Sequence, residues 1–207
     1  MARSKSSRAW LREHVTDPYV RRARTEGLRS RAAYKLEQIG ARDKLFSPGM
    51  TVVDLGAAPG GWSQVAACAV APGGQVYALD LLEFAPLAGV TQLRGDFREE
   101  SVLSELERHL AGRPVDVVLS DMAPNMSGVA AADQARMMAL AELALDFARA
   151  HLKPQGKLLV KLFHGAGFET FLKAMRERFE QVVVRKPEAS RSRSSEVYVL
   201  GKGLKRP

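Results

Sequence analysis

Three aspartates lie at or beside the ends of short apolar runs that are typical of buried β-strands. They are Asp54, Asp80 and Asp96. Because the carboxyl ends of neighbouring parallel strands meet at one edge of a sheet, these carboxylates are expected to lie together where such folds bind ligands. Asp80 can accept hydrogen bonds from both hydroxyls of a ribose, and Asp96 can accept one from an adenine amino group. A single aspartate of this kind could equally cap a helix or occupy a turn, but three in register favour a nucleoside site.

A glycine-rich segment, residues 54–62, follows the first of these strands and opens a predicted helix. Gly56 and Gly60 allow the backbone to approach a ligand closely. The spacing of the glycines departs from the G-x-G-x-x-G pattern of dinucleotide sites, and the carboxylate of Asp54 suits a cationic or hydroxyl-bearing group better than a pyrophosphate. A dinucleotide-dependent dehydrogenase is therefore the weaker interpretation.

The fourth and fifth predicted strands each bring a charged residue to the same region. Asp121 follows the fourth strand, in the segment 119–125, and Lys161 lies within the fifth, 157–163. A lysine in a strand that helices cover on both faces is rare unless it is paired or functional. Alternatively, Lys161 could lie at a solvent-exposed strand end, where it would have no functional role. The pattern favours Asp121 and Lys161 as candidates for a functional site.

Strand and helix patterns alternate along most of the chain. Short apolar runs predict seven strands, at 51–55, 75–79, 90–93, 115–120, 157–163, 181–184 and 197–200. Helical spacing of apolar residues predicts helices at 30–43, 62–70, 98–110, 132–152 and 168–178. Such alternation is typical of an α/β protein with a mostly parallel sheet that helices cover on both faces.

Length and composition fit one domain, since 207 residues with 46% hydrophobic and 26% charged side chains can bury a sizeable core. We expect residues 1–29 to form a basic, partly mobile arm and residues 30–207 to form a single domain. The single cysteine, Cys68, excludes an intramolecular disulfide and a cysteine-rich zinc cluster, and no metal site is expected. No apolar stretch approaches the roughly 20 residues that span a bilayer, so we expect no membrane partner and a cytoplasmic location.

The net charge of +8 is concentrated at the two ends of the chain. Residues 1–50 hold 12 Lys and Arg against 5 Asp and Glu, and residues 185–207 hold 7 against 2, whereas the middle is mildly acidic. Basic ends are typical of a protein that binds a polyanion, because neutralising phosphates releases counterions. A solubilising surface is the alternative. Candidate phosphate contacts are the basic residues of the arm together with Arg31, Lys186, Arg191 and Arg193.

Six segments in order along residues 30–200 resemble the motifs of the FtsJ/RrmJ family of S-adenosylmethionine-dependent ribosomal RNA ribose 2′-O-methyltransferases. They are DLGAAPGGWSQ (54–64), ALD (78–80), GDF (95–97), SDMAPN (120–125), VKLF (160–163) and SSEVYV (194–199). The resemblance implies a Rossmann-like methyltransferase fold. The catalytic set that it implies is Lys35, Asp121, Lys161 and Glu196. The cofactor-binding positions that it implies are Gly60, Trp62, Asp80, Asp96 and Asp121, with Asp54 and Gly56 beside them.

By this resemblance, the reaction is in-line transfer of a methyl group from the sulfonium of S-adenosylmethionine to a ribose 2′-hydroxyl, with Lys161 as general base. A free lysine has a pKa of about 10.4, so the site must lower that pKa. Lys35 and the sulfonium charge act in that direction, whereas the carboxylates of Asp121 and Glu196 would raise the pKa. Lys35 and Glu196 are expected to position the ribose, and Asp121 to orient Lys161.

The resemblance further implies a substrate, namely a uridine in the A-loop of 23S rRNA within the large ribosomal subunit. The basic arm and the C-terminal region would contact this RNA, and we expect a monomer because no heptad pattern suggests an interface. Phe163 and Tyr198 could stack a base, although aromatic residues on strands more often pack in the core. The alternatives are a ribose methyltransferase acting on transfer RNA or an mRNA cap, and a non-catalytic RNA-binding ribosome-assembly factor. A base methyltransferase is disfavoured because residues 121–125 lack an aromatic side chain against which a flipped base is placed.

Overall fold

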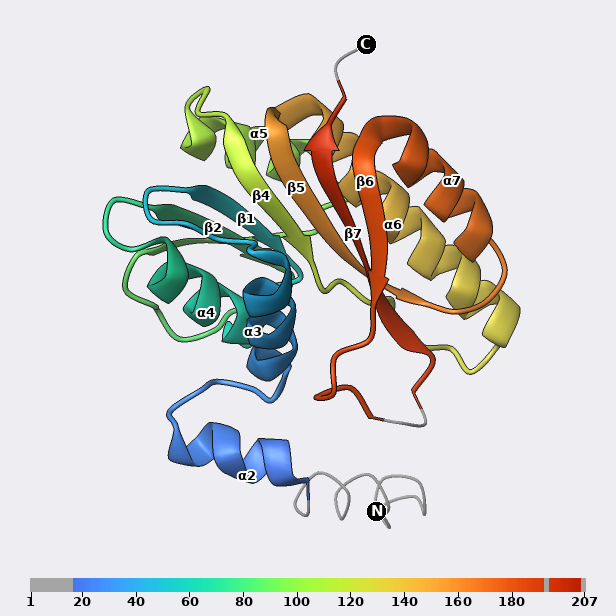
Figure 1. Cartoon of the computed structure of the whole chain (residues 1–207), viewed down its shortest axis with the longest axis horizontal. Helices are drawn as coiled ribbons and strands as arrows, with labels where there is room; N and C mark the ends of the chain where they lie inside the picture. Colours follow the sequence, from blue (N-terminus) through green and yellow to red (C-terminus); the bar gives the residue numbers. More distant parts are fainter. Residues whose placement is uncertain (1–16, 192–193, 206–207) are drawn as a thin grey trace.

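The computed structural model describes residues 17–191 and 194–205. A β-sheet forms the centre of this part of the chain (Figure 1). It has seven strands in the order β3-β2-β1-β4-β5-β7-β6. The strands are β1 (Thr51–Leu55), β2 (Gln75–Asp80), β3 (Val90–Arg94), β4 (Val115–Ser120), β5 (Leu152–Phe163), β6 (Phe179–Arg185) and β7 (Glu196–Leu204). Neighbouring strands of this sheet run parallel except at β7, which is antiparallel to both β5 and β6. The predicted mostly parallel sheet is confirmed.

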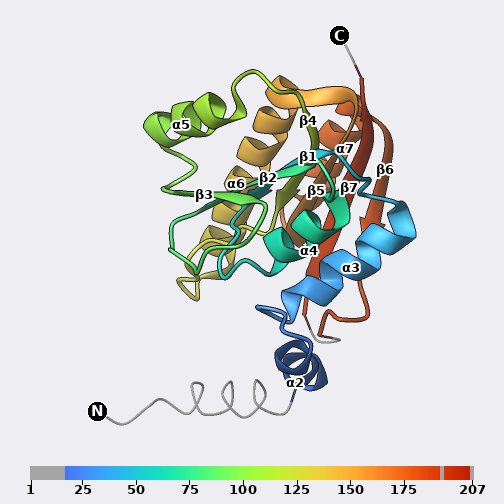
Figure 2. The same ribbon diagram turned by 90° about the vertical axis from the view of Figure 1, so that its left-hand side faces the viewer.

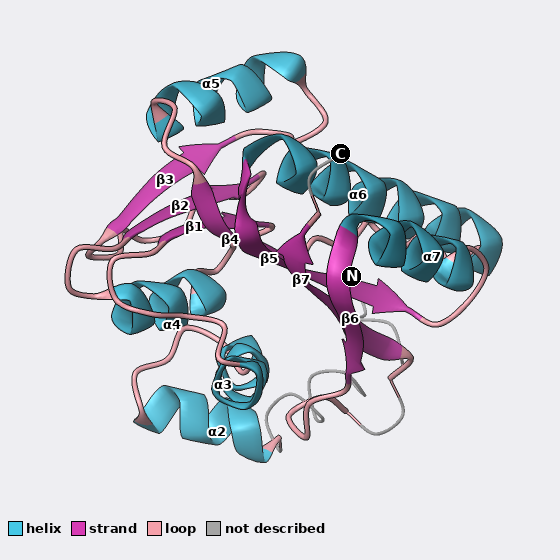
Figure 3. Ribbon diagram, turned by 45° about the horizontal axis from the view of Figure 1, so that its top comes forward, coloured by secondary structure: helices cyan, strands magenta, loops and turns pink. Residues whose placement is uncertain are grey.

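Helices cover both faces of the sheet, as predicted (Figure 3). They are α2 (Pro18–Thr25), α3 (Ala32–Asp43), α4 (Gly61–Val70), α5 (Glu100–Leu110), α6 (Ala130–His151) and α7 (Phe168–Arg178). Helices α5, α6 and α7 pack on one face in a core cluster that includes Val53 and Leu106. Helices α3 and α4 pack on the other face in a cluster that includes Val52 and Leu36. The side chains of adjacent β1 residues therefore point to opposite faces of the sheet, which is the period-two pattern of a strand buried on both sides.

Alternation along β5 decides where Lys161 points. Val160 and Leu162 belong to the cluster beneath α5, α6 and α7, whereas Leu159 belongs to the cluster beneath α3 and α4. Because successive side chains of a strand project to opposite faces, Lys161 faces α3 and α4 with Leu159. Lys161 is only 8% exposed, so the alternative position at a solvent-exposed strand end is excluded. The strand thus places a buried lysine on the face that carries Lys35.

Strand β5 begins earlier than the sequence pattern indicates. The predicted strand starts at residue 157, but in the structure α6 passes directly into a strand that starts at Leu152. Leu152 pairs with Val115 of β4, and the register between the two strands then shifts. Pro154 and Gly156 lie in this irregular stretch. Because proline and glycine normally mark a turn, the sequence pattern does not predict the first part of this strand.

Residues 17–29 of the predicted arm contain helix α2, which lies beneath α3 (Figure 2). The carboxylate of Asp17 caps α2 by accepting a hydrogen bond at 2.9 Å from the backbone N–H two residues further on. A small apolar cluster joins α2 to α3 and to the loop after β6, and its members are Ala23, Tyr34 and Ala189. The part of the arm predicted to be mobile includes residues 1–16, which lie outside the described residues.

Within residues 17–191 and 194–205, no helix is both long enough and apolar enough to cross a membrane. The same part of the chain holds no group of three or more His, Cys, Asp or Glu side chains arranged to bind a metal ion.

Candidate active site

A cavity of about 430 Å³ opens at the carboxyl ends of β1, β2, β3 and β4. Parallel α/β sheets bind ligands at this edge, and the volume falls in the range of small-molecule sites. The predicted cofactor residues that line the cavity are Gly56, Asp80, Asp96 and Asp121. The segment 122–125 and one side of α6 complete the wall. The structure therefore brings the ends of four strands together around one ligand-sized space, which Asp80 and Asp96 line, whereas Asp54, the third strand-end aspartate, does not.

Asp80 and Asp96 are fixed acceptors in this wall. Asp80 ends β2, where its Oδ2 accepts a hydrogen bond from the backbone N–H of Ala58 at 2.9 Å and its Oδ1 accepts one from Leu82 at 2.8 Å. Asp96 follows β3 and is held by Arg98, whose guanidinium donates to both carboxylate oxygens at 2.6–3.1 Å. Hydrogen bonds from Arg98 hold the pKa of Asp96 below its usual value. Each carboxylate is thus oriented before any ligand arrives.

Gly56 sits where the glycine loop meets the segment after β4. Its φ is +79°, and a Cβ built there would lie 2.7 Å from the backbone nitrogen of Met122. Both the backbone conformation and the contact exclude a side chain. Glycine at this position lets the loop after β1 and the segment after β4 approach each other at the floor of the cavity.

Asp54 lies beneath the glycine loop and is fully buried. Its Oδ2 accepts a hydrogen bond from the Ser63 hydroxyl at 2.6 Å, whereas no hydrogen-bond partner among the described residues reaches Oδ1. Burial raises the pKa of Asp54 to about 7; the hydrogen bond from Ser63 opposes the shift, and the carboxylates of Asp121 and Asp80 add to it. Asp54 does not form part of the cavity wall.

Gly60 and Trp62 also lie outside the cavity wall. Trp62 is 2% exposed, its indole N–H donates to the carbonyl of Ala32 at 2.9 Å, and its ring centroid lies 5.6 Å from that of Tyr198. The indole is therefore part of the core between α3, α4 and the sheet. Gly60 is the N-cap residue of α4 and has a φ of 98°. Of the seven predicted cofactor residues, four line the cavity, and Asp54, Gly60 and Trp62 do not.

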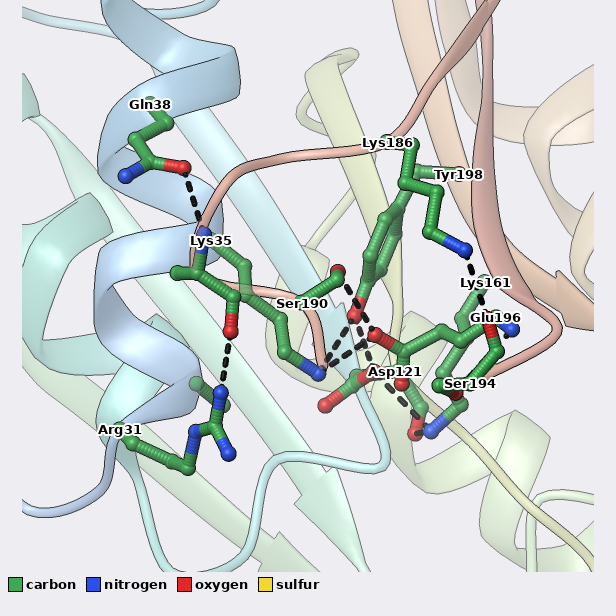
Figure 4. A network of polar contacts seen from close by, with 12 residues as sticks. Arg31, Lys35, Gln38, Asp121, Lys161, Lys186, Ser190, Ser194, Glu196 and Tyr198 are labelled. Atoms are coloured by element: carbon green, nitrogen blue, oxygen red, sulfur yellow. Dashed lines mark hydrogen bonds and ion pairs between the residues drawn. The ribbon is translucent and has the colours of Figure 1, made fainter. Parts of the chain in front are cut away.

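The four predicted catalytic residues meet in one polar network beside the cavity (Figure 4). Lys161 of β5 donates to the backbone carbonyl of Asp121 at 2.5 Å, and its Nζ lies 3.0 Å from Asp121 Oδ1. Lys35 of α3 donates to Oε1 of Glu196, the first residue of β7, at 2.6 Å. Because Asp121 also lines the cavity, this one residue connects the network to the ligand-sized cavity.

Tyr198 of β7 joins the two ion pairs. Its hydroxyl accepts a hydrogen bond from Lys35 Nζ at 3.3 Å and donates one to Asp121 Oδ1 at 3.5 Å. Burial raises the pKa of Tyr198 well above its usual value, and the carboxylates of Asp121 and Glu196 act in the same direction, so the hydroxyl keeps its proton. The predicted core position of Tyr198 is confirmed, because the residue is fully buried. Its role in the network was missed, although its position two residues after Glu196 places both on one face of the strand.

Lys35 and Glu196 form a shielded ion pair in which each side chain is 13% exposed. The hydroxyl of Ser190 donates to the same Glu196 oxygen at 3.2 Å. Burial alone would raise the pKa of Glu196, but the ammonium groups of Lys35 and Lys161 hold it below the usual value. Glu196 is thus a fixed anion that orients the Lys35 ammonium.

Three of the basic residues predicted to contact phosphate, Arg31, Lys186 and Arg191, have partners within the protein. The guanidinium of Arg31 is paired with Asp17 and also donates to a backbone carbonyl of the loop after β6. Lys186 donates to a carbonyl of the same loop at 2.6 Å, and Arg191 lies 3.7 Å from Asp17. Arg193 lies outside the described residues. These contacts attach the loop that precedes β7 to α2 and α3, and RNA contact by these residues stays a prediction.

Solved structures share this doubly wound fold. A Plasmodium falciparum protein assigned as a ribosomal RNA methyltransferase matches with a TM-score of 0.75 at 23% identity, over 85% of this chain and 98% of that chain. A Streptococcus mutans protein assigned as a methyltransferase, solved in complex with SAH, matches with a TM-score of 0.52 at 11% identity, over 84% and 96% of the two chains. The fold is that of the Rossmann-like methyltransferases.

The chain belongs to the FtsJ-like methyltransferase family, whose model matches residues 28–204. It is 62% identical over 201 residues to the ribosomal RNA large subunit methyltransferase E of Stenotrophomonas maltophilia. That similarity covers 97% of this chain and 96% of the relative. The family predicted from the six motifs is therefore confirmed.

Proposed function

We propose that this chain is an S-adenosylmethionine-dependent methyltransferase that modifies a ribose 2′-hydroxyl of 23S rRNA in the large ribosomal subunit. The observation that carries the proposal is the double position of Asp121, which lines the cavity and also holds Lys161. One residue thus links the methyl-donor site to the proposed base. Membership of the family, and a relative named as a ribosomal RNA large subunit methyltransferase, support the reaction class and the substrate.

The residues of the cavity fit S-adenosylmethionine. Asp80 offers its carboxylate to the ribose hydroxyls, and Asp96 offers its carboxylate to the adenine amino group. Gly56 and Asp121 would lie near the methionine end. When bound, the cofactor supplies an electrophilic methyl group on a sulfonium. The SAH in the S. mutans structure supports a cofactor of this type in this fold.

Lys161 is the proposed general base for the 2′-hydroxyl proton. A neutral amine has two N–H donors and one lone pair. The carbonyl oxygen and Oδ1 of Asp121 can accept both donors, since both lie within hydrogen-bond distance of Lys161 Nζ. The lone pair then points away from Asp121 and is available to take the hydroxyl proton. Asp121 therefore acts as a positioning group for the base.

Lys35 and Glu196 are proposed to position the acceptor ribose. Their ion pair joins α3 to β7, and the Tyr198 hydroxyl connects it to Asp121 at the cavity wall. Lys35 and Glu196, which would contact the acceptor ribose, are thus held at a fixed distance from the site proposed for the methyl donor. Fixed alignment of a nucleophile and its target can lower a barrier by roughly 7–11 kcal/mol, so positioning supplies much of the acceleration beside the base.

The proposed target is a uridine in the A-loop of 23S rRNA within an assembled large subunit, and the protein acts as a cytoplasmic monomer. The basic excess at both ends of the chain supports an RNA substrate, because Lys and Arg side chains neutralise phosphates. An intact Lys–Asp–Lys–Glu network supports catalysis over a purely structural role in ribosome assembly.

The test is transfer of a labelled methyl group from S-adenosylmethionine to undermethylated large ribosomal subunits, followed by mapping of ribose 2′-O-methylation. Wild type is expected to label one ribose, and Lys161→Ala to label none. Absence of label with a wild type that binds S-adenosylmethionine would show that the acceptor is wrong, and transfer RNA or capped RNA would be tested next. Label on a base would overturn the assignment of the ribose oxygen.

A further inference from the structure

Two loops form the rim of the cavity at the end of β2, namely the glycine loop 56–60 and the loop 81–89. From the cavity side, the carboxylate of Asp80 ties them together, because it accepts hydrogen bonds from the backbone N–H groups of Ala58 and Leu82. The relative placement of the two loops therefore sets the shape of the site proposed to hold the cofactor ribose.

Arg29 ties the same two loops together from the opposite side. Its guanidinium donates to the carbonyl of Pro59 in the glycine loop at 3.3 Å and to the carbonyl of Pro86 in the second loop at 2.7 Å. It also donates to the carbonyl of Ala85. The guanidinium carbon lies 5.7 Å from the ring centroid of Phe84, which belongs to the second loop. A single side chain thus bridges three carbonyl groups on two separate loops.

Gly60 leaves the space in which this bridge fits. A Cβ built on Gly60 would lie 2.9 Å from the ring of Phe84 and 3.1 Å from Cδ of Arg29. The φ of Gly60 is +98°, a conformation that disfavours any side chain. The glycine loop, the Phe84 ring and the stem of Arg29 are therefore in close contact.

The backbone of Arg29 is itself anchored to α4. Gln64 accepts a hydrogen bond from the Arg29 backbone N–H at 3.1 Å and donates one to the carbonyl of Gly27 at 3.0 Å. Because α4 begins directly after the glycine loop, this anchor fixes Arg29 relative to the loop it contacts. The segment between α2 and α3 is therefore attached to the outer side of the cofactor site.

We propose that Arg29 is a positioning residue for cofactor binding, which braces the two rim loops through their carbonyl groups. This inference rests on the proposed function, since it assigns Arg29 to the binding of S-adenosylmethionine. The planar guanidinium has donors directed toward several acceptors at once, whereas the single compact ammonium of lysine, on a flexible stem, cannot bridge both loops in the same geometry. Arg29→Lys keeps the positive charge and removes the bridge.

The experiment measures binding of S-adenosylhomocysteine by calorimetry in the absence of RNA, for wild type, Arg29→Lys, Arg29→Met and the control Arg108→Lys. Arg108 is an exposed residue of α5, so its replacement tests a charge-conserving change outside the bridge. Both Arg29 variants are expected to bind about three- to tenfold more weakly, which corresponds to the loss of one or two hydrogen bonds, and Arg108→Lys is expected to bind as tightly as wild type. The KM for S-adenosylmethionine is expected to rise by a similar factor, with kcat at saturating cofactor within about twofold of wild type.

Hydrogen exchange supplies a second readout. Amides of the loop 81–89 are expected to exchange faster in Arg29→Lys than in wild type, while those of β4 are unchanged. Unaltered S-adenosylhomocysteine affinity and unaltered exchange in Arg29→Lys would overturn the proposal, and a raised KM for RNA alone would assign Arg29 to phosphate contact. A wild type that binds neither S-adenosylmethionine nor S-adenosylhomocysteine would instead overturn the proposed function.

Discussion

The amine of Lys161 and the carboxylate of Asp121 are 3.0 Å apart, and the same amine lies 2.5 Å from the backbone carbonyl of Asp121. Both acceptors for the amine thus belong to one residue at the end of β4. That residue also lines the cavity. The orientation of the proposed base is therefore set by the strand that forms one wall of the proposed donor site.

Replacement of the proposed base should separate catalysis from cofactor binding. Lys161→Met keeps most of the side-chain volume but has no amine, so turnover is expected to fall by at least about 100-fold. Affinity for S-adenosylhomocysteine should stay within a few-fold, because Lys161 does not line the cavity. Methyl transfer to large subunits and calorimetry measure the two quantities. Lys153→Met serves as a control at the far end of β5, and a Lys161 variant that retains most of its turnover would contradict the assignment.

Removal of the Tyr198 hydroxyl should weaken the link between the two ion pairs. In Tyr198→Phe the ring still fills its place beside Trp62, while Lys35 and Asp121 lose their shared contact. We expect kcat to fall about five- to tenfold, as for the loss of one hydrogen bond, with the melting temperature nearly unchanged. Single-turnover methyl transfer measures the rate. An equal loss in cofactor affinity would show that the Tyr198 hydroxyl stabilises the cofactor site instead of the residues that position the acceptor ribose.

The buried carboxyl of Asp54 should make stability fall as pH rises. Its pKa is raised to about 7 in the folded chain, so between about pH 4 and 7 the folded state binds a proton that the unfolded state has lost. The stability contributed by the neutral carboxyl is full below about pH 4 and is lost as pH rises toward 7. Asp54→Asn removes this titration. Relative to wild type, the free energy of unfolding of the variant should therefore be higher at pH 8 than at pH 5 by about 1–3 kcal/mol. Thermal melts of both proteins at the two pH values measure this difference. A difference that is independent of pH would refute a titrating Asp54.

The anchor at the end of α3 should stabilise the fold in the opposite pH range. Asp43 accepts hydrogen bonds from Arg185 at 2.7 and 2.8 Å and from Lys202 at 2.9 Å, and Arg185 and Lys202 hold its pKa at about 2. This contribution is present above about pH 4 and is lost as pH falls toward 2. Asp43→Ala is expected to lower the free energy of unfolding by about 2 kcal/mol at pH 7, and by less at pH 3. Urea unfolding at both pH values measures the difference, and an equal loss at both would contradict the ion-pair explanation.

Salt should weaken RNA binding strongly and cofactor binding little. The basic excess lies at the two ends of the chain. The logarithm of the binding constant falls linearly with the logarithm of the salt concentration. Each phosphate contact adds about 0.9 to the steepness of this fall on a duplex and about 0.7 on a single strand. Fluorescence anisotropy with a labelled fragment of 23S rRNA, between about 50 and 200 mM salt, measures this slope. S-adenosylhomocysteine affinity over the same range is the control. A flat slope for RNA would contradict a phosphate-binding surface.

The sequence by itself determined the parts of this protein that depend on local period and on strand ends. Apolar runs in strand–helix alternation predict a mostly parallel sheet, and of the three strand-end aspartates Asp80 and Asp96 line one cavity, whereas Asp54 lies outside its wall. Strand alternation also explains why Lys161 faces α3, because Leu159 two residues before it packs on that face. These features follow from neighbours in the chain, so a local pattern suffices to predict them.

The tertiary structure decided which distant side chains meet. Lys35 and Glu196 pair because β7 is inserted antiparallel between β5 and β6, which brings the start of β7 against α3. The same arrangement buries Tyr198 between two ion pairs and gives the ring of Trp62 a core position. The guanidinium of Arg31 likewise donates to the carbonyl of Ala189, which lies 158 residues further along the chain. Contacts of this kind depend on strand order and register over more than 100 residues, and a local sequence pattern contains no information on either.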